Sequence, residues 1–213
     1  MRIVIANQKG GVGKSTSCVL LANYLTLEKN EEVVLFDLDM QETVFSKWER
    51  DRELYDNESL YEVLKMELEE YPRYAADIAA LKDQTQVIID MPGRLDDDAI
   101  LAVLKDADLI ICPMAYERSV FESSHVFARV ARHLNPNNKI VFLPTRLNKT
   151  IKYEIKEKVR QALASFGEIA PEIPERVALQ RIDTVSIGAE AKEIVQEAFE
   201  FIYSSYLKEN ASR

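Results

Sequence analysis

A glycine-rich segment near the N-terminus has the residue types that hold a phosphate group. It follows a short apolar run, residues 3–6, and reads Gln8-Lys9-Gly10-Gly11-Val12-Gly13-Lys14-Ser15-Thr16. Glycines let backbone N–H groups turn inward around an anion, where a Cβ would obstruct them, and a following helix adds its positive N-terminal end. Lys14 supplies a point charge for β- and γ-phosphates, and the Ser15 hydroxyl suits Mg²⁺. We therefore predict that Gly10 to Thr16 bind the phosphates of a nucleotide.

The loop departs from two common phosphate-binding patterns. The standard phosphate-loop motif has glycine where this chain has Gln8. Gly11 and Gly13, with Asp37 ending the next apolar run, imitate a dinucleotide fingerprint. However, the third glycine position of that fingerprint is Thr16, and two lysines flank the loop. The pattern therefore favours a nucleoside triphosphate over NAD.

Carboxylates follow two further apolar runs. Asp37 ends the run at 33–37 and Asp39 follows two residues later, and alternation places them on the same side of an extended chain. Such a pair can hold Mg²⁺-bound water and orient an attacking water. Asp90 ends the run at 87–90, in the form of the strand whose Asp contacts Mg²⁺ in phosphate-loop enzymes, and Gly93 can offer its N–H to a γ-phosphate. We predict a metal site of Ser15, Asp37 and Asp90.

The elements that must position these residues alternate between two kinds. Buried strands are predicted at 3–6, 33–37, 87–90, 109–112, 140–144 and 169–173. Helical spacing follows Ser15 and recurs at 95–105, 119–134, 151–166 and about 189–207. This alternation predicts an α/β fold, a mostly parallel twisted sheet with helices on both faces. In such sheets ligands bind at the carboxyl ends of the strands.

Length and composition predict a single folded domain over 1–213. The chain is 47% hydrophobic, and no apolar run approaches the ~18 residues of a membrane span. Cys18 and Cys112 are too few for a disulfide framework or a thiolate metal site. Residues 42–84 are interpreted as an acidic helical insertion at the sheet edge. We expect a cytoplasmic protein without membrane contact.

Charge is unevenly distributed. The net charge is −9, and residues 49–98 carry fifteen acidic and six basic side chains, whereas residues 139–160 carry seven basic and two acidic ones. Local charge matters more than total charge because salt screens distant charges. Lys149, Lys152 and Lys156 recur near helical spacing, and Arg160 continues the row. This face is either a solvated helix flank or a nonspecific track for DNA phosphates, and we predict the track.

Three motifs together resemble one family. Lys-Gly-Gly-Val-Gly-Lys-Ser-Thr with its extra lysine, Asp-Leu-Asp-x-Gln and Ile-Ile-Asp-x-Pro-Gly are similar to the deviant phosphate-loop ATPases of the ParA/MinD group. The preceding Ala6-Asn7-Gln8 is most like the ParA branch. The resemblance covers essentially the whole chain and is closest to the small ParA-type partition ATPases without an N-terminal DNA-reading domain. It implies a P-loop NTPase fold and slow hydrolysis of ATP to ADP.

The resemblance also implies roles for individual residues. Lys9 would reach the phosphates of a second subunit in an ATP-bound dimer, and Asp39 would position the lytic water. Arg146 and Pro174 would border the base. The implied partners are a second copy of the chain, nonspecific DNA and a ParB-like centromere-binding protein, with nucleoid association in the ATP state. Met40 and Glu42 depart from the family pattern near the water-positioning loop.

Other functions of the same fold stay open. An ATPase could position another cargo or regulate a mobile element instead of partitioning a plasmid or chromosome. An ATP-binding module with little turnover is the non-enzyme alternative. Membrane positioning is disfavoured because the polar face of the C-terminal helix is acidic, through Glu190, Glu193, Glu197, Glu200 and Glu209.

Overall fold

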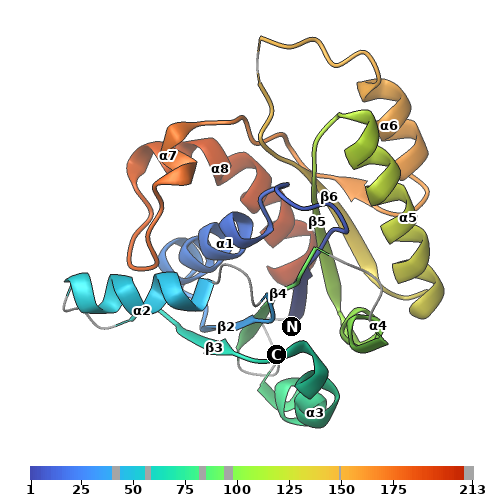
Figure 1. The fold of residues 1–213 in the computed structure, drawn as a ribbon. Coiled ribbons are helices and arrows are strands. Elements are labelled where there is room, and N and C mark those ends of the chain that lie inside the picture. The colour runs from blue at the N-terminus through green and yellow to red at the C-terminus, as the bar shows by residue number, and fades with distance from the viewer. Residues whose placement is uncertain (40–43, 56–58, 82–84, 94–97, 149, 209–213) are drawn as a thin grey trace.

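Parallel strands form a twisted sheet at the centre of the computed structural model, and helices cover both of its faces (Figure 1). The structure describes residues 1–39, 44–55, 59–81, 85–93, 98–148 and 150–208. Within them the sheet has seven strands in the order β3-β2-β4-β1-β5-β6-β7, and every neighbouring pair is parallel. The strands are β1 (Arg2–Ile5), β2 (Val33–Asp37), β3 (Glu62–Lys65), β4 (Gln86–Asp90), β5 (Leu109–Met114), β6 (Lys139–Pro144) and β7 (Glu168–Ile169).

Strand alternation divides the apolar side chains between two cores. In β1, Ile3 and Ile5 belong to one core, whereas Val4 belongs to the other. β4 divides in the same way, with Ile88 on the first side and its neighbours on the second. Because both faces are buried, these strands read as continuous apolar runs. This is why the sequence revealed them.

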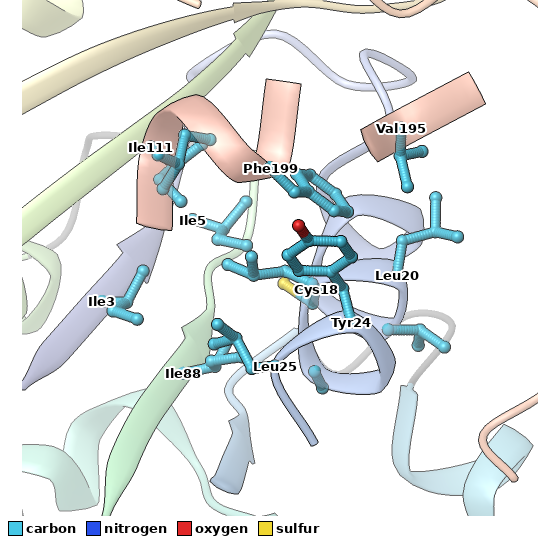
Figure 2. Close-up of a cluster of buried hydrophobic side chains, with 14 of the residues drawn as sticks. Ile3, Ile5, Cys18, Leu20, Tyr24, Leu25, Ile88, Ile111, Val195 and Phe199 are labelled. Carbon is cyan, nitrogen blue, oxygen red and sulfur yellow. The ribbon is translucent and has the colours of Figure 1, made fainter. Parts of the chain in front are cut away.

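The helices are shared between the two faces. Helix α1 (Lys14–Lys29), α2 (Val44–Tyr55), α7 (Val177–Gln180) and α8 (Ala189–Ile202) cover the first core, and the π-helical turn η2 (Tyr203–Leu207) continues α8. Figure 2 shows Cys18, Tyr24 and Leu25 of α1 between the sheet and Phe199 of α8. The second core lies under the turn η1 (Leu68–Glu70), α3 (Tyr71–Leu81), α4 (Asp98–Asp106), α5 (Arg118–Leu134) and α6 (Lys156–Leu163).

The predicted fold class is confirmed, with one strand that the sequence did not reveal. The described residues between 44 and 81 form α2, η1 and α3, and they also supply β3, the edge strand beside β2. In β3 only Val63 is buried, and it belongs to the first core. The predicted strand at 169–173 is shorter, ending at Ile169, although Ala170 and Ile173 still donate backbone hydrogen bonds to β6.

The predicted helix over 151–166 is wrong in its first turn. Helix α6 begins at Lys156, and Ile151 is 54% exposed rather than packed. The side chain of Asn148 accepts hydrogen bonds from the backbone and hydroxyl of Thr150, and the Tyr153 hydroxyl accepts one from the Asn148 backbone. These local bonds compete with a helical backbone. Lys152 therefore does not share a helix face with Lys156.

The sheet order brings separate segments to one edge. β1 lies between β4 and β5, and the carboxyl ends of β1, β2, β4 and β6 lead to the loops that carry the predicted site residues. Ligands of open parallel sheets bind at this edge. Among the described residues, no helix has the length and apolar character needed to cross a membrane.

Candidate functional site

The glycine-rich loop is wrapped around the N-terminus of α1. Gly11 has φ +75° and Gly13 has φ +91°, a left-handed conformation that favours glycine. Helix α1 begins at Lys14, whose side chain is only 8% exposed. The loop thus presents backbone N–H groups, a helix N-terminus and a buried cation together, which is an anion-binding arrangement.

A cavity of about 800 Å³ lies over this loop. The described residues that line it are Gly10, Gly11, Gly13, Lys14, Ser15, Thr16, Leu38, Asp39, Glu67, Leu68, Glu69, Pro92, Gly93 and Arg146. Gly93 lies against the loop, because a Cβ built there would be 3.2 Å from Lys14 Nζ. Val12 is buried beneath the loop, and Lys9 is exposed and absent from this lining. The cavity therefore joins the loop to the residues after β2 and β4, as the sequence predicted.

Asp90 is the most unusual polar group of the site. It is fully buried, and neither carboxylate oxygen has a hydrogen bond of regular geometry to the residues that the structure describes, although the Ser15 and Cys18 side chains lie close enough to favour its charged form. Burial raises the pKa of Asp90 to about 7, and the nearby Ser15 hydroxyl opposes that shift. A buried carboxylate without partners is costly. Its two free oxygens beside Ser15 therefore suit a cation.

Asp37 and Asp39 occupy different environments. Asp37 pairs in register with Asp90 on the adjacent strand and is 1% exposed. Its oxygens accept hydrogen bonds from the backbone N–H of Asp39 at 3.1 Å and of Phe45 at 2.9 Å. Burial raises the pKa of Asp37, and these N–H groups oppose the shift. Asp39 lies beyond the strand end and lines the cavity, whereas Met40 and Glu42 lie outside the described residues.

The end of β6 reaches over the loop. The Thr145 hydroxyl donates a hydrogen bond to the Val12 carbonyl at 2.7 Å, and the Arg146 guanidinium donates one to the Gly11 carbonyl. Arg146 Nη2 also lies 3.6 Å from Glu175 Oε1. Arg146 has φ +56°, a conformation that costs a non-glycine residue about 1–3 kcal/mol. Backbone strain of this kind is frequent at functional sites.

A second cavity of about 270 Å³ adjoins the first. Its lining residues include Pro174, Leu179 and Gln180. Gly13, Thr16 and Arg146 line both cavities, so the two hollows share a wall.

The structure adds residues that sequence reasoning did not select. Asn7 is buried, donates to the Pro113 carbonyl and the Ser124 hydroxyl, and accepts the Lys9 backbone N–H at 3.0 Å. Glu67 and Glu69, which follow the unpredicted strand β3, line the larger cavity. No motif in the sequence marked these acids, because their position depends on β3 joining the sheet.

The predicted basic face is not assembled on one helix. Lys149 lies outside the described residues, and Lys152 is exposed in the segment before α6. Lys156 Nζ lies 2.5 Å from Glu172 Oε1, and Arg160 donates to the Tyr116 hydroxyl at 3.5 Å. Lys156 and Arg160 therefore already have partners within the chain.

The fold and this site define an α/β domain of the P-loop NTPase type. The family model for the CobQ/CobB/MinD/ParA nucleotide-binding domain matches residues 3–185. The chain belongs to this family. The resemblance to the ParA/MinD group is thereby confirmed.

Solved structures share the fold across nearly the whole chain. A putative plasmid partition protein from Borrelia burgdorferi, bound to AMPPNP, has a TM-score of 0.72 at 24% identity and 98% coverage of both chains. A McdA–ATP complex from Cyanothece has a TM-score of 0.71 at 16% identity, with 95% of each chain covered. The MinD cell division protein of Aquifex aeolicus has a TM-score of 0.67 at 17% identity, covering 96% of this chain and 97% of that one.

A curated relative matches part of the chain. The maintenance of carboxysome distribution protein A of Gloeobacter kilaueensis is 32% identical over 111 residues. The match covers 52% of this chain and 47% of the relative, so it spans about half the length of each protein.

Proposed function

We propose that this protein is an ATP-hydrolysing switch that closes into a dimer around ATP and drives the partition of a DNA cargo. The observation that carries the proposal is the glycine-rich loop at the N-terminus of α1. This loop lies together with the buried Lys14, and the buried Asp90 carboxylate, whose oxygens have no hydrogen bond of regular geometry, lies nearby. A polyphosphate with a divalent cation satisfies both groups at once. Family membership and the nucleotide complexes of similar folds support it.

The residues present fit Mg²⁺. Ser15 offers a hydroxyl, and Asp90 offers two oxygens that lack protein partners among the described residues. Oxygen ligands and few protein contacts are what Mg²⁺ prefers. Asp37 would be a further ligand beside Asp90, although its oxygens already accept hydrogen bonds from two backbone N–H groups. The ion, when bound, would neutralise charge that develops on the phosphates.

The chain's own groups divide the remaining work. The loop N–H groups and Lys14 hold the phosphates, and Asp39 at the cavity wall orients the attacking water. Pro174 and Arg146 border the base in the smaller cavity. A chain without an added arginine from a partner hydrolyses ATP slowly, because such arginines contribute about 10³–10⁵ in rate. A ParB-like protein is the proposed source of that stimulation.

Lys9→Ala is expected to bind ATP as a monomer and fail to dimerise. Lys9 is exposed and lies outside the lining of its own cavity, so its charge is available to the phosphates of a second subunit. Like charges on two facing nucleotides repel, and one lysine from each subunit offsets this. Sedimentation with and without ATP checks the result, with Lys105→Ala as an exposed-lysine control. An unchanged ATP-dependent dimer in Lys9→Ala would exclude the role.

Nonspecific DNA binding is proposed for the basic segment at Lys149, Lys152, Lys156 and Arg160. Of these, Lys152 is exposed. Lys158, six residues further along the chain on α6, is exposed as well. Reversal of Lys156 would place a carboxylate against Glu172 and disturb the fold. The informative variant is therefore Lys152→Glu with Lys158→Glu.

This double reversal is expected to weaken DNA binding equally on all sequences. The slope of log affinity against log salt should fall by about 1.8, since each neutralised phosphate contributes about 0.9. Filter binding over a salt series, with ATP present, measures the slope. Lys65→Glu with Lys105→Glu, which changes net charge equally at other exposed sites, is the control. ATP-dependent binding with an unaltered slope would move the DNA track to another surface.

Positioning of a protein cargo is the second candidate function. The observation in its favour is the 32% identity to a protein named for carboxysome distribution. The same dimerisation and hydrolysis cycle would serve it. The two functions differ in cargo, which pull-down of the ATP-trapped form separates: a centromere-binding protein indicates partition.

A further inference from the structure

The end of β6 contacts the phosphate loop at two successive carbonyl groups. Thr145 Oγ1 donates to the Val12 carbonyl at 2.7 Å, and the Arg146 guanidinium donates to the Gly11 carbonyl. Thr145 is 5% exposed, so its hydrogen bond is shielded from water. The two bonded pairs are separated by 133 and 135 residues in the sequence, so only the fold brings them together.

The conformation of Arg146 makes both contacts available. Consecutive side chains of an extended strand point to opposite faces, so Thr145 and Arg146 could not both reach the loop from a regular strand. Arg146 has φ +56°, which breaks this alternation immediately after β6 ends at Pro144. The guanidinium lies against Gly11, since a Cβ built there would be 3.8 Å from Arg146 Nη1, an ordinary van der Waals distance.

These two bonds fix the direction of two peptide groups. In a trans peptide the C=O and the following N–H point in opposite directions. The Gly11 and Val12 carbonyls point toward β6, so the N–H groups of Val12 and Gly13 point away from it. β6 and β4 lie on opposite sides of β1. Gly93, which follows β4, lies against the same loop near Lys14 and Gly10, so a ligand at the loop would lie between these two sides.

We propose that Thr145 and Arg146 are positioning residues that hold the phosphate loop in its anion-binding conformation before nucleotide arrives. An anion site is strong when its donors are already oriented, because no reorganisation is then needed on binding. The loop alone, with glycines at 10, 11 and 13, could turn its peptide groups either way. The inference rests on the proposed nucleotide binding and assigns Arg146 a role toward the phosphates besides its place beside the base.

Thr145→Val and Thr145→Ser test the inference with Mg²⁺–ADP and with pyrophosphate. ADP avoids hydrolysis and ATP-dependent dimerisation, and pyrophosphate lacks the base and ribose. Loss of one shielded hydrogen bond predicts a fall in affinity of about five- to tenfold for Thr145→Val, of the same size for both ligands. Thr145→Ser retains the hydroxyl and should stay within about twofold of the wild type. Calorimetry gives the ADP affinity, and displacement of ADP gives that of pyrophosphate.

Thr184→Val is the matched control for a general loss of stability. The Thr184 hydroxyl is also buried and donates to Asp51 Oδ2 at 3.1 Å, away from both cavities. Its melting temperature should fall about as far as that of Thr145→Val, while both ligand affinities stay at the wild-type value. An equal loss of affinity in Thr184→Val would reduce the effect at Thr145 to stability and overturn the inference.

Arg146→Gly is the second test variant. It removes the guanidinium, and glycine adopts the positive φ of this position without strain. It should weaken pyrophosphate as well as ADP, with a loss for ADP at least as large because Arg146 also lines the smaller cavity. Its effect on pyrophosphate should be less than additive with Thr145→Val because both act on one loop. A loss confined to ADP would restrict Arg146 to the base. A wild type that binds neither ligand would overturn the proposed function itself. Two results would overturn the inference of a pre-formed loop: wild-type protein that binds ADP but not pyrophosphate, or a Thr145→Val variant whose affinities for both ligands equal those of the wild type.

Discussion

Asp39→Ala is expected to bind ATP normally and to hydrolyse it about 10²–10⁴-fold more slowly than the wild type. That factor is the usual contribution of a positioned proton acceptor to the rate. Asp39 lines the cavity above the phosphate loop, whereas Asp37 and Asp90 lie buried beneath it. The backbone N–H of Asp39, not its side chain, donates to Asp37, so the turn should survive the substitution. The variant should accumulate as an ATP-bound dimer.

Single-turnover hydrolysis and nucleotide affinity, measured on the same sample, check this result. Asp77→Ala, which removes an exposed carboxylate from α3, should hydrolyse ATP at the wild-type rate. If Asp39→Ala also turned over at that rate, the attacking water would have to be oriented by another group. Glu67 and Glu69 on the same cavity wall would then be the next residues to substitute.

Lys14→Ala should lower ADP affinity by about 10²–10³-fold. Lys14 is buried at the start of α1 and lines the cavity that the loop forms. Removing one partner of a shielded ion pair costs about 3–5 kcal/mol, and the lower part of that range, about 3–4 kcal/mol, corresponds to that factor. Binding calorimetry with Mg²⁺–ADP measures it without interference from dimerisation.

Lys9→Ala is the matched control, because it removes a lysine of the same loop that lies outside the cavity lining. Its ADP affinity should remain close to that of the wild type. Comparable losses in both variants would point to a general effect of loop charge. An ADP affinity for Lys14→Ala within about threefold of the wild type would contradict the phosphate-loop assignment.

Local chemistry was enough to predict the phosphate loop and most of the sheet. The glycines at 11 and 13 adopt the left-handed conformations that only their missing side chains make easy, and this requirement is visible in the sequence. Strands β1, β2, β4, β5 and β6 are buried on both faces, so each appears as an apolar run. Asp90 could be placed at a strand end because it ends such a run.

Elements with weak local signals could not be predicted. The edge strand β3 buries only Val63, so Glu62 to Lys65 have no apolar run to mark them. The missing first turn of the 151–166 helix depends on hydrogen bonds around Asn148 and Tyr153, which compete with the helical spacing of the isoleucines. The DNA-binding prediction was affected most, since it placed Lys152 and Lys156 on one helix face.

The sequence by itself determined that a glycine-rich loop follows the first strand and that acids end the strands at 33–37 and 87–90. Only the tertiary structure decided which groups surround them. Thr145 and Arg146 reach Val12 and Gly11 because β6 lies two strands from β1 and because Arg146 leaves the strand with a positive φ. Residue type and spacing specify what a segment can do locally, whereas contacts between distant segments depend on how the whole sheet is ordered.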